Sequence, residues 1–274
     1  MSSLESKVVA ITGTASGIGR ALALDLAQRG CHLALSDVDE DGLASVRKEA
    51  SQYGTKVTAQ RVDVASRQAV FDWAEQVVAD HGSVNIIINN AGVAITGTVA
   101  ELSIEDFEWL MGINFWGVLY GTKAFLPHLI DSGDGHVVNV SSVFGMIGVP
   151  SQGAYNAAKF AVRGLTECLR QELLMDEVPV AVTCVQPGGI KTNIARAARA
   201  RGRAAQQKDK LASNFDKMAR TTPAAAAATI IEGIIAKRPR VLIGADARVI
   251  DLVQRLLPTG YQGITRRLAQ RTPL

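Results

Sequence analysis

Short apolar runs alternate with amphipathic helical stretches along most of this 274-residue chain. A short run that is apolar throughout is typical of a parallel strand buried on both faces, and the helices between such runs supply the crossover connections. The predicted strands are Lys7–Thr12, His32–Asp37, Lys56–Val62, Val84–Asn89, His136–Ser141, Val180–Gln186 and Arg240–Ile243. We therefore expect an α/β fold, a doubly wound seven-stranded parallel sheet with helices on both faces.

Helical stretches fill the gaps between these strands, and neither a linker nor an internal repeat interrupts the pattern. They are Gly17–Arg29, 40–53, 66–81, 103–131, 153–175 and 224–236. We expect one domain over residues 1–245, with a helical excursion at 193–220. Residues 246–274 form a C-terminal helical tail, broken at Pro258–Gly260.

Composition excludes several classes of function. The chain is 47% hydrophobic and 20% charged, which suits a folded domain, and its formal net charge of +3 predicts no nucleic-acid partner. No window approaches about 18 uninterrupted apolar residues, and no apolar signal segment begins the chain, so we expect a cytoplasmic protein without stable membrane insertion. The three cysteines match no metal-ligand spacing and lie in apolar segments; we expect no metal site and buried thiols. The four histidines are expected to be solvated or capping residues.

A glycine-rich turn lies between the first predicted strand and the first predicted helix. Its candidate cofactor-binding residues are Gly13, Ser16, Gly17, Ile18 and Gly19. Glycine lets the backbone approach a pyrophosphate, and a helix N-terminus offers free N–H groups there. An ordinary tight turn would also use glycine, so the position after the first strand is what favours dinucleotide binding.

Asp37 ends the second predicted strand, where a carboxylate can hydrogen-bond the adenosine ribose hydroxyls and repel a 2′-phosphate. Neither Ser16 nor Val38 is basic, so the sequence favours NAD over NADP; Asp37 could equally cap a helix. Further candidate cofactor contacts follow the third and fourth strands, where turn chemistry is the alternative explanation. They are Asp63, Val64, Asn90, Ala91 and Gly92.

Tyr155 and Lys159 are four residues apart on a predicted helix and therefore share a face. A nearby ammonium favours the phenolate and lowers a tyrosine pKa, which suits the tyrosine to proton transfer. Ser142 follows the fifth strand and can donate a hydrogen bond to a substrate oxygen. Asn114 is an amide among apolar neighbours and could bind a water that holds Lys159.

Together these features resemble the short-chain dehydrogenase/reductase family, a Rossmann-type fold. The matching features, in order, are T12-G13-x3-G17-x-G19, N89-N90-A91-G92, Asn114, Ser142, Y155-x3-K159 and P187-G188. The resemblance implies that Tyr155 is the general acid/base and Ser142 polarises the carbonyl. It implies that Lys159 binds ribose and Asn114 supports a proton relay. It adds Pro187, Gly188, Ile190 and Thr192 as cofactor contacts, although Thr192 could instead cap the next helix, and it implies a homodimer or homotetramer.

The substrate is expected to be a lipophilic small molecule because the candidate pocket residues are apolar. They are Ala94, Val143, Phe144, Met146 and Val149. The leading hypothesis is NAD-linked interconversion of a secondary alcohol and a carbonyl. A 3-oxoacyl thioester reductase is the catalytic alternative, and a non-catalytic dinucleotide sensor or scaffold is the alternative of another class.

Two basic segments allow two interpretations each. The excursion at 193–220 is interpreted as a solvated helical face, with recognition of an anionic substrate group as the alternative. The tail is expected to pack on the domain or on another subunit, with contact to a membrane surface as the alternative.

Overall fold

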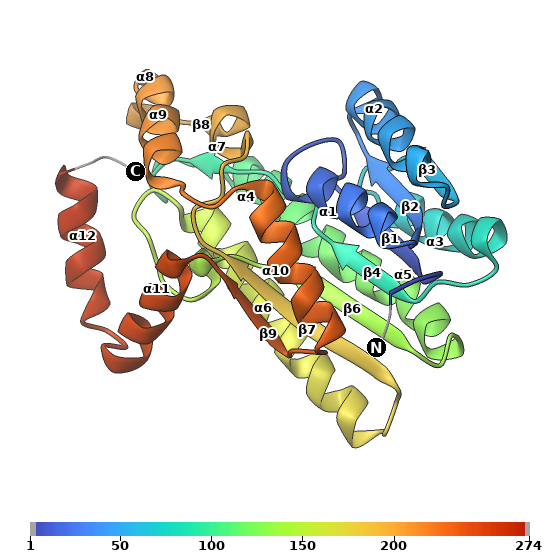
Figure 1. The fold of residues 1–274 in the computed structure, drawn as a ribbon. Coiled ribbons are helices and arrows are strands. Elements are labelled where there is room, and N and C mark those ends of the chain that lie inside the picture. Colours follow the sequence, from blue (N-terminus) through green and yellow to red (C-terminus); the bar gives the residue numbers. More distant parts are fainter. Residues whose placement is uncertain (1–3, 272–274) are drawn as a thin grey trace.

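All seven predicted strands are present, and they form one parallel sheet (Figure 1). The computed structural model describes residues 4–271. The strands are β1 Val8–Thr12, β2 His32–Asp37, β3 Val57–Arg61, β4 Ile86–Asn89, β6 Gly135–Val140, β7 Val180–Pro187 and β9 Arg240–Ile243. Their order is β3-β2-β1-β4-β6-β7-β9, so the expected doubly wound sheet is confirmed.

Helices cover both faces of the sheet. One layer comprises α1 Gly17–Gln28, α2 Glu40–Ala50 and α10 Pro223–Ile235, which pack on β-strand residues such as Ile11 and Leu33. The other comprises α3 Arg67–His81, α5 Gly117–Asp131 and α6 Gly153–Met175. Because central strands such as β1, β4 and β6 are buried from both sides, Val and Ile can follow one another along them without alternation.

The chain changes direction between β1 and β4. It moves outward from β1 through β2 to β3, then returns to place β4 against the other side of β1. The loops after β1 and β4 therefore meet at the carboxyl edge of the sheet. A crevice at such a switch point is where doubly wound sheets bind ligands.

The long helix predicted at 103–131 is interrupted. It consists of α4 Ile104–Met111, a π-helical turn at Gly112–Trp116, and then α5. A single π turn places one extra residue in the helix and is frequent at functional sites. Asn114 lies in this turn and is fully buried.

The excursion at 193–220 contains a strand that the helical prediction missed. Two-residue strands β5 Ile95–Thr96 and β8 Arg199–Ala200 form a second, parallel sheet. The helices of the excursion are α7 Ile194–Ala197, α8 Gly202–Gln206 and α9 Lys208–Met218.

The tail forms the two expected helices, α11 Ala245–Leu256 and α12 Tyr261–Arg271. Figure 1 shows α12 at the left edge of the molecule, away from the sheet. Within residues 4–271, no helix is long and apolar enough to cross a bilayer.

Two expectations about single residues are wrong. His136 is fully buried in β6, where its Nε2 lies 2.8 Å from Thr183 Oγ1, so it is neither solvated nor a cap. Cys168 is exposed on α6, whereas Cys31 and Cys184 are buried as expected.

Candidate active site

The glycine-rich loop leaves no room for side chains at two of its glycines. A Cβ on Gly19 would lie 2.0 Å from the Gly13 carbonyl oxygen, and one on Gly13 would lie 2.7 Å from Ala91 Cα. Gly13 and Gly17 also adopt φ of +72° and +57°, in the left-handed region. The loop is therefore a bare backbone surface at the N-terminus of α1, whose form suits a pyrophosphate.

Asn90 holds this loop from behind. Its Nδ2 donates to the carbonyl oxygens of Thr12 and Gly13 at 2.9 and 3.0 Å, and the Thr12 hydroxyl accepts from the N–H groups of Asn90 and Ala91. The loops after β1 and β4 are thus bonded into one unit. The side chain of Asn90 supports the loop, and its neighbour Gly92 is exposed.

Asp37 lies beside the loop, as the dinucleotide hypothesis requires. One carboxylate oxygen accepts from the N–H of Ala15 at 2.8 Å; the other accepts from Val38 and Asp39 at 2.7 and 3.1 Å. Asp39, not Asp37, is the N-cap of α2. The carboxylate is partly exposed, so it keeps acceptor capacity for a further hydrogen bond.

Other predicted cofactor residues differ in their placement. Ile18 packs against the core, and Val64 is buried beneath α5, where its side chain meets Gly117. Asp63 is exposed and accepts from the N–H of Ala65. Ser16 precedes α1 as an exposed N-cap whose hydroxyl makes no capping bond.

Thr192 lies over the glycine-rich loop, because a Cβ added to Gly17 would lie 3.2 Å from Thr192 Cγ2. The N-cap of α7 is Asn193, so the alternative role of Thr192 as that cap is wrong. Pro187 ends β7, Gly188 donates to the Ile243 carbonyl, and Ile190 is buried. The segment that follows β7 therefore reaches the glycine-rich loop through Thr192.

Ser142, Tyr155 and Phe144 gather beside that edge. Ser142 follows β6 in extended conformation, and its hydroxyl oxygen accepts from the N–H of Phe144 at 3.1 Å. The Phe144 and Tyr155 rings meet edge to face with centroids 6.0 Å apart. The side chain of Ser142 lowers the pKa of Tyr155, so the two hydroxyls are close enough to interact.

Burial changes the proton affinities of this site. It raises the pKa of Tyr155 to about 12, against a smaller lowering by the hydrogen bond with Ser142. It lowers the pKa of Lys159 to about 8 because a buried ammonium loses hydration. In the protein alone Tyr155 is therefore protonated at neutral pH, and the expected lowering of its pKa by Lys159 is absent.

Lys159 is 3% exposed, and its Nζ donates to the Val140 carbonyl at 2.9 Å. The same Nζ is 5.6 Å from the centroid of the Tyr155 ring. The lysine is therefore next to the tyrosine but anchored to the end of β6. A Cβ on Gly92 would lie 3.7 Å from this Nζ, which places the ammonium next to the loop that follows β4.

Asn114 reaches the same glycine from the π turn. A Cβ on Gly92 would lie 3.3 Å from Asn114 Oδ1. That oxygen accepts from the Val93 N–H and the Asn114 Nδ2 donates to the Val93 carbonyl, both at 2.8 Å. The side chain thus clamps the chain that follows β4, and a water link to Lys159 stays a prediction.

The predicted pocket residues divide into two groups. Phe144 is partly exposed beside Tyr155, and Ala94 accepts from the N–H of Arg199 next to β5. Val143 and Met146 are 5% and 2% exposed and pack with Ala247 in a small cluster under α11. The second group shapes the wall from behind, and contact with substrate stays a prediction for all of these residues, including the buried Val149.

Asn156 is a further site residue that the sequence analysis missed. Its Nδ2 donates to the carbonyls of Phe144 and Ile147, both at 2.7 Å, and its Oδ1 accepts from Val149 at 3.0 Å. One amide therefore shapes the whole loop between β6 and α6. The available signal was a second polar residue directly after Tyr155.

The basic excursion is held by partners inside the protein. Arg201 binds Asp106 through two parallel bonds, Nη2 to Oδ1 at 2.7 Å and Nε to Oδ2 at 2.9 Å, and Asp106 is 4% exposed. Arg199 lies 3.6 Å from the centroid of the Trp109 ring, and Arg196 pairs with Asp216. The excursion is therefore fastened to α4, although all three arginines remain exposed, in agreement with the interpretation as a solvated face.

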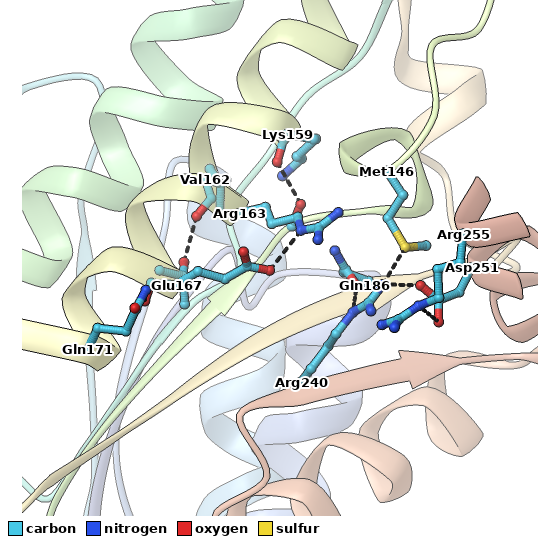
Figure 2. Close-up of polar contacts among 12 residues, drawn as sticks. Met146, Lys159, Val162, Arg163, Glu167, Gln171, Gln186, Arg240, Asp251 and Arg255 are labelled. Carbon is cyan, nitrogen blue, oxygen red and sulfur yellow. Dashed lines mark hydrogen bonds and ion pairs between the residues drawn. The ribbon is translucent and has the colours of Figure 1, made fainter. Parts of the chain in front are cut away.

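The tail is fastened to the pocket wall by Arg240 (Figure 2). This side chain from β9 donates to Gln186, to Met146 Sδ at 2.6 Å and to Asp251 of α11 at 2.6 Å. Burial alone would raise the pKa of Asp251, but hydrogen bonds from Arg240 and Arg255 lower it. The carboxylate therefore stays charged and keeps α11 in place.

Comparison with known proteins places the chain among similar sequences and structures. Residues 7–202 match the family described as short chain dehydrogenase. The oxidoreductase SadH of Mycobacterium tuberculosis is 52% identical over 96% of this chain and 95% of its own. A short-chain dehydrogenase/reductase from Burkholderia phymatum in complex with NAD has a TM-score of 0.86 and 31% identity, covering 93% of this chain and 96% of that one. A 3-oxoacyl-[acyl-carrier-protein] reductase of Thermotoga maritima is 36% identical over 69% of this chain and 76% of its own.

Proposed function

Because the chain belongs to the short-chain dehydrogenase family of oxidoreductases, we propose that it transfers hydride between NAD and a secondary alcohol or the matching carbonyl. The observation that carries the proposal is the convergence of Ser142, Tyr155 and Lys159 on the edge of the crevice beside the glycine-rich loop. Cofactor binding by the loop, and catalysis by these residues with Asn114, are parts of the same proposal.

Each side chain has a distinct part in the chemistry. Ser142 donates a hydrogen bond to the substrate oxygen and holds it next to the Tyr155 hydroxyl. Tyr155 gives its proton to that oxygen in reduction and takes it back in oxidation. NAD, when bound, supplies the hydride acceptor, and its positive ring favours the phenolate. Lys159 holds a positive charge beneath the crevice, within reach of a ribose hydroxyl.

The high pKa of Tyr155 bears on the direction of reaction. A protonated tyrosine is ready to donate to a carbonyl, whereas oxidation of an alcohol needs an added positive charge to remove the proton. We therefore expect oxidation to accelerate as pH rises, and reduction to proceed without that requirement.

The preference for NAD is supported by Asp37. Its carboxylate faces the edge of the loop, where a 2′-phosphate would meet a like charge. The neighbouring cation on β3, Arg61, is 3.4 Å from Glu40 and so already lies against a carboxylate. Catalytic efficiency should be higher with NAD than with NADP, and the substitution Asp37→Ser should reduce that difference.

A lipophilic substrate is supported by Phe144, which offers an aromatic edge next to Tyr155. Reduction of a 3-oxoacyl thioester is the second candidate, favoured by the similarity to the Thermotoga reductase. Recognition of an anionic carrier would need free cations near the crevice. Arg196 and Arg201 are already paired with Asp216 and Asp106, which makes this candidate the weaker one.

Assembly as a homodimer or homotetramer is a further part of the proposal. Trp116, the last residue of the π turn before α5, is 45% exposed, and Phe160 of α6 is 42% exposed. They offer an apolar surface that a second copy could cover.

The test is a panel of secondary alcohols of increasing size, incubated with NAD or NADP, in which the absorbance of reduced cofactor is followed. We expect turnover with NAD, and a loss of about 100-fold or more in kcat for Tyr155→Phe. Unchanged dinucleotide binding in the variant serves as the control. Equal turnover by Tyr155→Phe would overturn the proposed mechanism, and activity restricted to acyl thioesters with NADPH would select the second candidate.

A further inference from the structure

The C-terminal helices α11 and α12, here called the tail hairpin (residues 245–271), carry many exposed aliphatic side chains. Leu252, Leu256 and Leu268 are 57%, 70% and 56% exposed. The complete set is Val249, Leu252, Leu256, Leu257, Ile264 and Leu268. One interpretation of the sequence expected the tail to pack on the domain. This holds for Ala247 and Ile250 of α11, whereas the aliphatic residues of this set remain exposed.

The exposed residues follow helical spacing. On α11, Val249, Leu252 and Leu256 recur at i, i+3 and i+7, which puts them on one face, while Ala247 on the opposite side is fully buried. On α12, Ile264 and Leu268 are four residues apart. Each helix thus presents a row of aliphatic side chains to solvent, and in α11 this row lies apart from Ala247 and Ile250, which pack on the domain.

The C-terminal segment that contains the tail hairpin has an excess of positive charge. Residues 245–274 contain five arginines and two aspartates, a balance equal to the +3 of the entire chain, and no acidic residue follows Asp251. Arg248, Arg255 and Arg267 each precede an exposed aliphatic residue, so they lie at the border of the apolar faces. Arginine in this position can keep its guanidinium at a polar layer while its stem joins the apolar one.

The tail hairpin is also attached to the active site. The Asp246 carboxylate of α11 accepts from the Gly189 N–H at 2.6 Å, in the segment that closes over the glycine-rich loop. The Tyr261 hydroxyl of α12 accepts from the Gly148 N–H at 3.0 Å, next to the pocket residue Val149. With the Arg240–Asp251 pair (Figure 2), these bonds hold the hairpin beside the loop between β6 and α6.

We propose that the tail hairpin docks the protein on the surface of an anionic lipid bilayer. The aliphatic face enters the boundary between head groups and acyl chains, and Arg248, Arg266 and Arg267 bind lipid phosphates. Helices of 12 and 11 residues are too short to span a bilayer, so docking is peripheral. The proposal does not depend on the cofactor or the substrate proposed above.

A second copy of the chain fits this surface less well. A two-fold contact between tail hairpins would bring the same surface of each copy together, and therefore place arginines opposite arginines. The remainder of the chain has a formal charge balance of zero, so it offers no overall opposite charge. An anionic bilayer satisfies the apolar and the basic residues at once.

The experiment is flotation of the full chain with vesicles of phosphatidylcholine, with and without a third of phosphatidylglycerol. We expect the protein to float with the anionic vesicles in low salt, and to remain at the bottom with neutral vesicles or in high salt. Absence of flotation with anionic vesicles would overturn the proposal.

Two hairpin variants and one matched control identify the surface. Arg266→Gln combined with Arg267→Gln should lower partition into anionic vesicles about 30-fold, since each basic residue near such a surface contributes about 1 kcal/mol. Leu252→Ser with Leu256→Ser should also lower it. The control Leu174→Ser with Met175→Ser removes exposed apolar residues from the end of α6, 59% and 81% exposed, and should float like the wild type.

All four proteins should have the same circular dichroism, because every substituted side chain is exposed. If the hairpin variants float like the wild type, the surface is assigned wrongly. If the leucine variant instead lowers the molecular mass in sedimentation without changing flotation, a second copy covers the hairpin and the proposal fails.

Discussion

The loop at residues 12–19 follows β1, and the excursion at 193–220 begins beside it, next to Thr192, but the two segments are held differently. The loop depends on backbone groups: Gly13 and Gly19 have no space for a side chain, and Asn90 donates to two loop carbonyls. The excursion is joined to β5 by backbone bonds at β8 and is fastened further by side chains, with Arg201 paired to Asp106 and Arg199 stacked on Trp109.

This difference suggests that the loop and the excursion tolerate substitution differently, the loop being proposed for the cofactor and the excursion for the substrate. A backbone cradle tolerates little substitution and offers the same form to every dinucleotide. A segment fastened by arginines can change its sequence and still be fastened, so it suits the part of the site that adapts to the substrate. Damage to the loop should therefore abolish cofactor binding, while damage to the excursion should affect the substrate alone.

The largest effect is expected for Gly19→Ala. The added methyl would meet the Gly13 carbonyl at 2.0 Å and Asn90 Nδ2 at 2.6 Å, so the loop must shift. We expect the free energy of unfolding to fall by about 1–3 kcal/mol, as for other overpacked sites, and dinucleotide affinity to fall at least about tenfold. Calorimetric titration with NAD measures the dinucleotide affinity, and urea unfolding measures the change in stability.

Gly164→Ala is the matched control, because a Cβ there meets nothing within 4 Å and alanine favours helix. If Gly19→Ala bound NAD as the wild type does, the backbone account of the loop would be wrong.

Lys159→Met should separate stability from activity. The folded pKa of about 8 lies below the unfolded value of 10.5, so the buried ammonium destabilises the protein most at low pH, and this cost disappears as pH rises through 10.5. The full cost corresponds to about 3 kcal/mol, less the lost bond to the Val140 carbonyl. The inactive variant should be more stable than the wild type at pH 7.

Urea unfolding at neutral and alkaline pH measures this difference, which should narrow as pH increases. A variant that is less stable than the wild type at pH 7 would show that the lysine contributes to the fold more than burial costs it.

A smaller and more selective effect is expected for Arg201→Gln. Hydrogen bonding to Arg201 lowers the pKa of the Asp106 carboxyl, and its loss leaves that buried group without its charge partner. The excursion should loosen, which raises the KM for the alcohol about threefold to tenfold and leaves the affinity for NAD unchanged. Steady-state kinetics, in which the alcohol and NAD are varied in turn, gives a separate KM for each of them.

Arg203→Gln provides the comparison, because Arg203 lies on the same segment but is 84% exposed. An equal change in the KM for NAD in Arg201→Gln would mean that the excursion and the loop are not held independently.

Most of the main sheet was predictable because a strand that is buried on both faces has a continuous run of apolar or small residues in the sequence. Runs such as HLALSD at His32–Asp37 are apolar or small at most positions, and their bounds agree with β2. The glycines near residue 17 and the Tyr155–Lys159 spacing were predictable for a similar reason, since each depends on neighbours along the chain.

The remainder depends on contacts between distant residues. The two-residue strands β5 and β8 are too short to show periodicity, and their pairing joins residues about a hundred positions apart. The partners of Arg201 and Arg240 lie on other elements, so no local pattern in the sequence indicates either ion pair. The π turn at Asn114 and the burial of His136 likewise follow from packing, which no local pattern records.

The most direct test of the account follows the hydride itself. A secondary alcohol that the protein oxidises is prepared with deuterium on the carbinol carbon and incubated with NAD, and the reduced cofactor is analysed by mass spectrometry and NMR. We predict deuterium at C4 of the nicotinamide with the wild-type protein, and at least about 100-fold slower transfer with Tyr155→Phe. Reduced cofactor without deuterium, or equal transfer by the variant, would contradict the assignment of Tyr155 and its neighbours as the site of hydride-transfer chemistry.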